Sequence, residues 1–143
     1  MILLSTHITK DNKQLIDDIV GKPFTLYQAF KMGGIGSKRM SIDKTSENIE
    51  HLLNDVSDIN YSNIELRPNG IIVMVNRGLD SYHWVIPYRQ LVIYKTNKLS
   101  IHAQGKFITF KNNKSYKENR KFIDKMIELK SDNQHKYSMP IYG

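Results

Sequence analysis

The chain has 143 residues, of which 40% are hydrophobic and 24% are charged, a composition that suits a single globular domain with its own core. It has no cysteine, which excludes disulfides, thiol nucleophiles and cysteine-type zinc sites. The net charge of +7 is uneven, because residues 1–63 carry seven Lys/Arg and eight Asp/Glu, whereas residues 64–143 carry fourteen and six. A basic half favours an anionic partner, although sixteen of the 21 cations are lysines, the usual solvated surface residue.

The N-terminal part, residues 1–63, is predicted to be mostly helical. A first helix begins after a cap at Thr9 and ends at Gly21, a second begins at Pro23, and a third begins at Thr45 or Ser46. Apolar side chains recur at helical spacing in each: Leu15, Ile16, Ile19 and Val20; Phe24, Tyr27 and Phe30; Ile49, Leu52, Leu53 and Val56.

The stretch KMGGIGSKRM, residues 31–40, is the one segment that resembles a motif. Its weak candidate residues for binding phosphate are Gly33, Gly34, Gly36, Lys38 and Arg39. The spacing departs from G-x-x-x-x-G-K-[ST], and Arg39 stands where G-x-G-x-x-G needs its third glycine. We therefore predict an exposed, mobile connection between two helical segments, with at least one glycine at positive φ and no bound nucleotide.

From residue 64 the hydrophobic period changes from 3.6 to 2, which predicts strands. Pro68-Asn69-Gly70 is a turn signal inside the first hairpin, and polar turn segments separate the runs that follow. The alternation predicts an antiparallel meander of six strands with one face buried. The runs after the turn are 71–76, 82–88, 91–95, 99–103 and 107–111, and the expected core is Trp84, Ile86, Leu91, Ile93, Leu99, Ile101, Phe107, Phe122, Ile123 and Met126.

A last helix is predicted over residues 115–130. Ser115 and Glu118 have the spacing of a capping box, and the apolar residues that follow form one stripe. Residues 131–143 lack periodicity and are expected to form a tail.

The segments WVIPYRQLVIYKTNKLSIHAQGKFITF and NRKFIDKMIELK, within residues 64–130, resemble the pleckstrin-homology (PH) superfold, in particular small bacterial PH-like and GRAM-like domains. The resemblance implies a sheet of seven strands closed by the final helix, so the seventh strand has to come from the N-terminal part. Lipid-binding members carry basic residues on a long loop between their first two strands. Here that loop is the short RPNG, and only Arg67 corresponds.

Chemical motifs are scarce. The five histidines (His7, His51, His83, His102 and His135) lack metal-ligand spacing, and His83 and His102 are expected on an exposed face or edge of the sheet. No serine lies in a nucleophile elbow. We expect no cofactor, no metal and no catalytic activity.

The prediction from the sequence is a single α+β domain over residues 1–143, with a helical N-terminal third packed on an antiparallel PH-like sheet. The absence of a signal peptide or an apolar run of about 20 residues indicates a cytoplasmic protein. We expect a non-catalytic binding or scaffold module that recognises a protein, with its oligomeric state open. The alternative is an electrostatic binder of nucleic acid or an anionic membrane through Lys106, Lys111, Lys114, Lys117, Arg120, Lys121 and Lys125.

Overall fold

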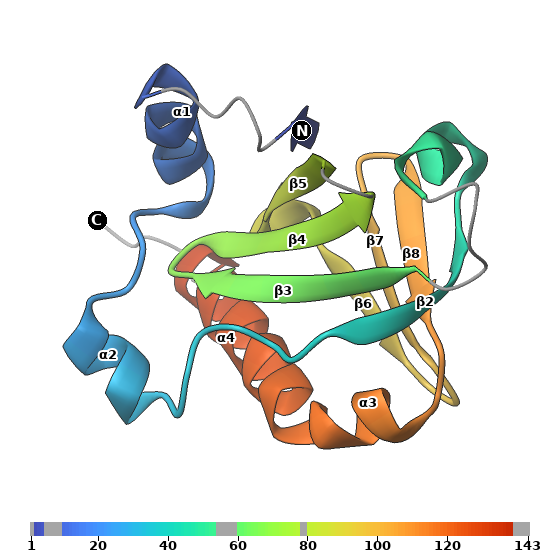
Figure 1. Ribbon diagram of the computed structural model, residues 1–143. Helices are drawn as coiled ribbons and strands as arrows, with labels where there is room; N and C mark the ends of the chain where they lie inside the picture. The colour runs from blue at the N-terminus through green and yellow to red at the C-terminus, as the bar shows by residue number, and fades with distance from the viewer. Residues whose placement is uncertain (1, 5–9, 54–59, 78–79, 139–143) are drawn as a thin grey trace.

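The computed structural model describes residues 2–4, 10–53, 60–77 and 80–138 (Figure 1). It confirms the predicted α+β fold class, with helices at the N-terminal side, an antiparallel sheet, and a C-terminal helix packed on that sheet. The helical elements are α1 (Lys10–Val20), α2 (Leu26–Lys31), α3 (Lys114–Glu118) and α4 (Arg120–Ser138), with short 3₁₀ helices η2 (Glu47–Leu52) and η3 (Tyr88–Gln90). Among the described helices, none combines the length and the apolar character that crossing a membrane requires.

The sheet has the strand order β1-β5-β4-β3-β2-β8-β7-β6 in the described part of the chain. Strand β2 joins its two halves, because Met40 and Ser41 pair with β3 whereas Ile42, Lys44 and Thr45 pair with β8. A bulge at Asp43 accompanies the change of partner. The strands are β1 (Ile2–Leu4), β2 (Met40–Thr45), β3 (Tyr61–Arg67), β4 (Gly70–Arg77), β5 (Asp80–Pro87), β6 (Val92–Lys95), β7 (Leu99–Ala103) and β8 (Lys106–Phe110).

Residues 1–63 supply two strands, β2 between β3 and β8 and β1 at the edge of β5, so the described sheet has eight strands where the sequence pattern predicted six. The prediction that residues 1–63 are mostly helical was therefore wrong in part. The helix predicted from Thr45 or Ser46 is a short 3₁₀ helix, η2, which follows β2 with Ser46 at its N-cap and buries Ile49 and Leu52 in the core. Val56 lies outside the described residues.

The two faces of the central strands are both covered, which corrects the expectation of one buried face. Ile71 and Trp84 point into the main core beneath α4, whereas Ile72 and Val85 pack against Ile16 of α1 on the opposite face. Two-sided burial explains the apolar run in β4, because Ile71, Val73 and Val75 enter the main core while Ile72 is buried against α1. In Figure 1, α1 and α4 accordingly lie on opposite sides of the sheet.

The expected core is largely confirmed. Seven of its residues are fully buried: Trp84, Ile86, Leu91, Leu99, Ile101, Ile123 and Met126. Ile93 and Phe122 pack against the core from partly buried positions. Phe107 was assigned to the wrong face, because Ile108 and Phe110 are the inward residues of β8 and Phe107 stacks on the His102 ring with a centroid separation of 5.2 Å.

The helix ends differ from those predicted. Asn113 caps α3 by accepting a hydrogen bond from the Tyr116 amide, so Ser115 and Glu118 do not form the capping box. The helix is interrupted at Asn119, the C-cap of α3. Helix α4 then begins at Arg120 and continues through residues 131–138, which were expected to be tail. The reciprocal capping box belongs to α2, between Thr25 and Gln28, rather than to a helix that starts at Pro23. Gly21 ends α1 as predicted, and Thr9 lies outside the described residues.

Candidate binding groove and basic corner

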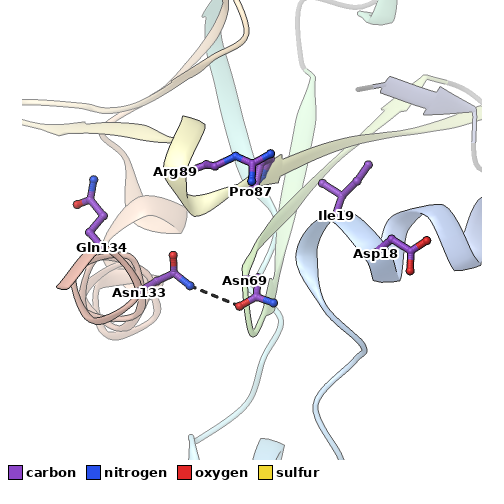
Figure 2. A pocket seen from close by; sticks show the side chains of 7 residues that line it. All are labelled: Asp18, Ile19, Asn69, Pro87, Arg89, Asn133 and Gln134. Atoms are coloured by element: carbon purple, nitrogen blue, oxygen red, sulfur yellow. Dashed lines mark hydrogen bonds between the residues drawn. The ribbon is translucent and has the colours of Figure 1, made fainter. Parts of the chain in front are cut away.

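A groove of about 550 Å³ lies between α1, the β3–β4 turn, η3 and the C-terminal half of α4 (Figure 2). We call it the α1–α4 groove. Its lining is polar at the rim and apolar at Ile19 and Pro87. The lining residues are Asp18, Ile19, Asn69, Pro87, Arg89, Asn133 and Gln134.

The β3–β4 turn forms the floor of the groove and is bonded to every element around it. The Asn69 amide donates to the Val20 carbonyl (2.8 Å) at the end of α1, and the Asn69 carbonyl accepts from the Tyr88 amide (2.9 Å) of η3. Figure 2 shows Asn69 and Asn133 pointing toward one another, and the Asn133 Nδ2 donates to Asn69 Oδ1 at 3.4 Å. These bonds fix the β3–β4 turn relative to α1, η3 and α4.

Gly70 permits the tight packing behind this turn. A Cβ at Gly70 would lie 2.3 Å from the Ile86 carbonyl oxygen, 2.6 Å from Val20 Cγ1 and 2.8 Å from Pro87 Cα. Only glycine allows β4, β5 and α1 to meet so closely, so the PNG sequence serves packing as well as the reversal of the chain.

Tyr88 anchors η3, which forms one side of the groove, to the core below it. Its buried hydroxyl donates to the Arg67 carbonyl at 2.9 Å, and burial raises the pKa of Tyr88 well above its ordinary value. Lys130 of α4 donates to the Tyr88 carbonyl at 3.3 Å, and partial burial lowers the pKa of Lys130. This contact sets α4 against η3 on the side where Arg89 enters the groove.

The rim of the groove is suited to hydrogen bonding rather than to binding a charge. The carboxamides of Asn69, Asn133 and Gln134 each offer a donor and an acceptor, as a peptide group does. Arg89 and Asp18 contribute one cation and one anion, so the formal charge of the lining is balanced.

A second, smaller cleft of about 320 Å³ lies under α1 and contains Arg67. The Arg67 side chain binds Glu65 (2.5 Å), Asp17 (3.0 Å) and the Gly21 carbonyl (2.8 Å), and the residue is only 8% exposed. The one residue that the PH-like resemblance offered for a phosphate is thus occupied by two carboxylates. Its geometry is that of a structural tie between α1 and β3.

His83 lines the same cleft and is half-buried, not exposed as expected, because α1 covers that face of β5. Its Nδ1 atom is buried without a hydrogen-bond partner, and burial lowers the pKa of His83. His102 lies between Tyr94 and Phe107, with Nε2 2.8 Å from Ser100 Oγ, and burial lowers its pKa as well. No group of three or more acidic, cysteine or histidine side chains that would hold a metal occurs in the described residues.

The glycine stretch is not a joint between two helices, because it connects α2 to β2. Positive φ values at Gly33 (77°) and Gly34 (105°) confirm that part of the prediction. Beyond them the chain lies along β3: the Leu66 amide donates to the Ile35 carbonyl (2.7 Å), and the Ser37 amide donates to the Ile64 carbonyl (2.8 Å). The second half of the stretch is therefore held against the sheet.

The fold brings this stretch to the start of α4. Asn119 Oδ1 accepts from the Lys38 amide (2.8 Å), and Asn119 Nδ2 donates to the Lys38 carbonyl (3.2 Å). A Cβ at Gly33 would lie 3.3 Å from Lys125 Nζ. Two groups of cations that are far apart in sequence thus adjoin, and we call them the basic corner: Lys38, Arg39, Lys117, Arg120, Lys121 and Lys125.

The other predicted basic residues are distributed along β8 and α3. Lys106 begins β8 and donates to the Gln104 carbonyl (3.3 Å), whereas Lys111 follows the last residue of that strand. A five-residue strand extends by about 3.3 Å per residue, so Lys106 lies at the far end of β8 from the basic corner. Lys111 and Lys114 are exposed on the segment that leads to it.

The α1–α4 groove was not predicted from the sequence. Asn69 was recognised only as a turn residue, and Asn133 and Gln134 were assigned to the tail. The available signal in the sequence was the apolar pair Ile127 and Leu129, which carries the apolar pattern of α4 close to residue 131 and favours a helix that continues past it.

No family model matches the chain, and comparison with curated proteins and with solved structures finds no match.

Proposed function

We propose that the protein is a non-catalytic recognition module that binds an extended peptide segment of a partner protein in the α1–α4 groove. The observation that carries the proposal is the set of three carboxamides, Asn69, Asn133 and Gln134, in one groove with the apolar residues Ile19 and Pro87. Carboxamides pair with both the N–H and the C=O of a peptide backbone, and Ile19 and Pro87 offer contacts to an apolar side chain.

The charge of the groove favours a peptide over a polyanion. Asp18 balances Arg89 in the lining, whereas a phosphate site gathers cations without a carboxylate. The framework is also pre-organised: the bonds of Asn69 to Val20 and Tyr88 fix the floor, so that little ordering of the protein opposes binding. The two antiparallel runs β2–β5 and β6–β8, joined through the β2–β8 pair and covered by α4, support in addition the proposal that the domain is PH-like.

The experiment is a selection of binding peptides from a random displayed library on the full chain, followed by NMR titration of the selected peptides. We expect the side-chain amide resonances of Asn69, Asn133 and Gln134 to shift. Asn133→Leu and Arg89→Ala should each weaken binding by roughly tenfold, the loss of one or two directed hydrogen bonds.

Asn112→Leu is the matched control, because Asn112 is exposed and lies outside the groove. It should leave peptide affinity unchanged. Selected peptides whose shifts map to α2 or β6 instead would overturn the groove assignment. Titration of single- and double-stranded nucleic acid at two salt concentrations tests the alternative function, since binding to phosphates weakens steeply as salt rises.

A further inference from the structure

Helix α2 presents an apolar surface to solvent. Leu26 is 92% exposed, Phe30 is 85% exposed and Tyr27 is 67% exposed. These are large side chains on one short helix, which we call the apolar tip, and it stands apart from the sheet in Figure 1. Single exposed apolar residues are ordinary, but three adjoining ones indicate an interaction surface.

The apolar tip is held in place rather than loosely attached. Phe24 before α2 and Met32 after it pack against the main core, and the Thr25–Gln28 capping box closes the first turn. The helix thus uses flanking residues to anchor itself and turns its own large side chains outward. Their exposure follows from the packing of the fold.

The apolar tip adjoins the basic corner directly. Gly33 follows the C-terminal cap of α2, and Lys125 of α4 approaches Gly33. Lys31 on α2 lies 4.7 Å from the centroid of the Tyr27 ring, and Arg39 lies 4.2 Å from that of Tyr61. Among the described residues, no ion pair neutralises a cation of the basic corner.

We infer that the apolar tip and the basic corner together form a docking surface for an anionic membrane. Leu26 and Phe30 would enter the headgroup–acyl boundary, while the lysines face acidic headgroups. Insertion of a few apolar side chains alone, or electrostatic attraction alone, gives weak and reversible adsorption to a membrane, but the two together give stable attachment. Charge complementarity identifies the occupant: the six cations of the basic corner attract an anionic surface, and the adjoining apolar tip offers exposed aliphatic and aromatic side chains that the phosphate groups of nucleic acid do not bury.

The docking surface is independent of the α1–α4 groove. Lys125 and Asn133 both belong to α4 and are separated by eight residues, which is about 12 Å along a helix. A membrane at the start of α4 would leave the groove near its end accessible, so the inference stands or falls separately from the proposed peptide binding.

The test is binding of the full chain to vesicles of phosphatidylserine mixed with phosphatidylcholine, compared with vesicles of phosphatidylcholine alone. We expect binding to the mixed vesicles only, weakened by salt. Leu26→Gln/Phe30→Gln and Lys117→Glu/Lys121→Glu should each lower the partition coefficient by roughly tenfold or more.

Two control variants match these changes in kind. Val92→Gln/Tyr94→Gln removes exposed apolar side chains from β6, and Lys10→Glu/Lys13→Glu makes the same change in net charge on α1. Both should bind like the wild type. A Phe30→Trp variant reports insertion directly, because the one native tryptophan, Trp84, is buried, and the added indole should shift its emission to the blue on mixed vesicles.

Failure to bind mixed vesicles at low salt would overturn the inference. The inference would also be overturned if Lys117→Glu/Lys121→Glu abolished binding while Leu26→Gln/Phe30→Gln left it intact. That result would indicate electrostatic adsorption without insertion. Binding to nucleic acid without binding to vesicles would assign the basic corner to a different partner class. Circular dichroism of each variant confirms that a loss of binding does not come from unfolding.

Discussion

The side chain of Asn119 and the backbone of Lys38 form a reciprocal pair of hydrogen bonds across 81 residues of sequence. Asn119 is 2% exposed, and its Nδ2 also donates to the Ser115 carbonyl at 2.8 Å. One carboxamide therefore satisfies three backbone groups and joins the glycine stretch to the break between α3 and α4.

Replacing Asn119 by Ala should lower the free energy of unfolding by about 2–4 kcal/mol, because it leaves the backbone groups of Lys38 without partners near the core. Asn119→Asp should not rescue it, since a carboxylate cannot donate to the Lys38 and Ser115 carbonyls. Urea denaturation measures both. Asn112→Ala, at an exposed position, serves as the control and should change stability by less than about 0.5 kcal/mol.

Gly70 and Gly36 provide a matched pair for testing close packing. Gly70→Ala should destabilise the domain by about 2 kcal/mol or more, because its Cβ would overlap the Ile86 carbonyl and Val20. Gly36 has no atom within 4 Å of the corresponding Cβ position and no positive φ, so Gly36→Ala should be neutral or slightly stabilising. Equal effects in thermal denaturation would contradict the packing around the β3–β4 turn.

Trp84 should behave as the largest core side chain. It is 1% exposed, and its Nε1 donates to Gln104 Oε1 at 3.2 Å. Trp84→Ala should therefore cost about 3–5 kcal/mol, whereas Gln104→Ala should cost only about 1 kcal/mol because it removes the partner and not the ring. Near-native stability of Trp84→Ala in denaturant titrations would place the ring outside the core.

His83 should make stability depend on pH in mildly acidic solution. Burial lowers its pKa in the folded protein below the ordinary value of 6.5, and Glu65 only partly opposes this effect, while Arg67 reinforces it. The unfolded chain then binds a proton that the folded chain does not, so the contribution is complete above pH 6.5 and is lost as pH falls toward the folded pKa.

The measurement for His83 is the free energy of unfolding from pH 8 to pH 5 for the wild type and for His83→Gln. The variant should lose less stability over this range, because it lacks the imidazole whose pKa differs between the folded and the unfolded chain. Parallel curves for the two proteins would mean that His83 takes up its proton equally well in both states.

The sequence identified those elements whose pattern is local. Alternation around Trp84 and Ile86 and the stripe containing Ile123 and Met126 predict strands and a helix because each repeats along one continuous segment. Strand β2 escaped detection because four of its six residues are polar or charged and its bulge at Asp43 interrupts the alternation on which a strand prediction depends.

Features made by distant segments were not accessible in this way. Two-sided burial of Ile72 and Val85 depends on where α1 docks, and the α1–α4 groove depends on Asn69 meeting Asn133. The outward orientation of Phe30 similarly follows from which flanking residues reach the core. Helical spacing of Tyr27 and Phe30 specifies a shared face but not what that face contacts.

The double pairing of β2 has a consequence for the order of folding. The hairpins of β3–β5 and β6–β8 form between neighbours in sequence, whereas the β2–β8 contact joins Ile42 to Phe110. Long-range closure of this kind is entropically slow, so we expect β2 to dock on β8 late. Stopped-flow kinetics should then show that Ile42→Val mainly speeds unfolding, whereas Ile71→Val, within a hairpin, mainly slows folding.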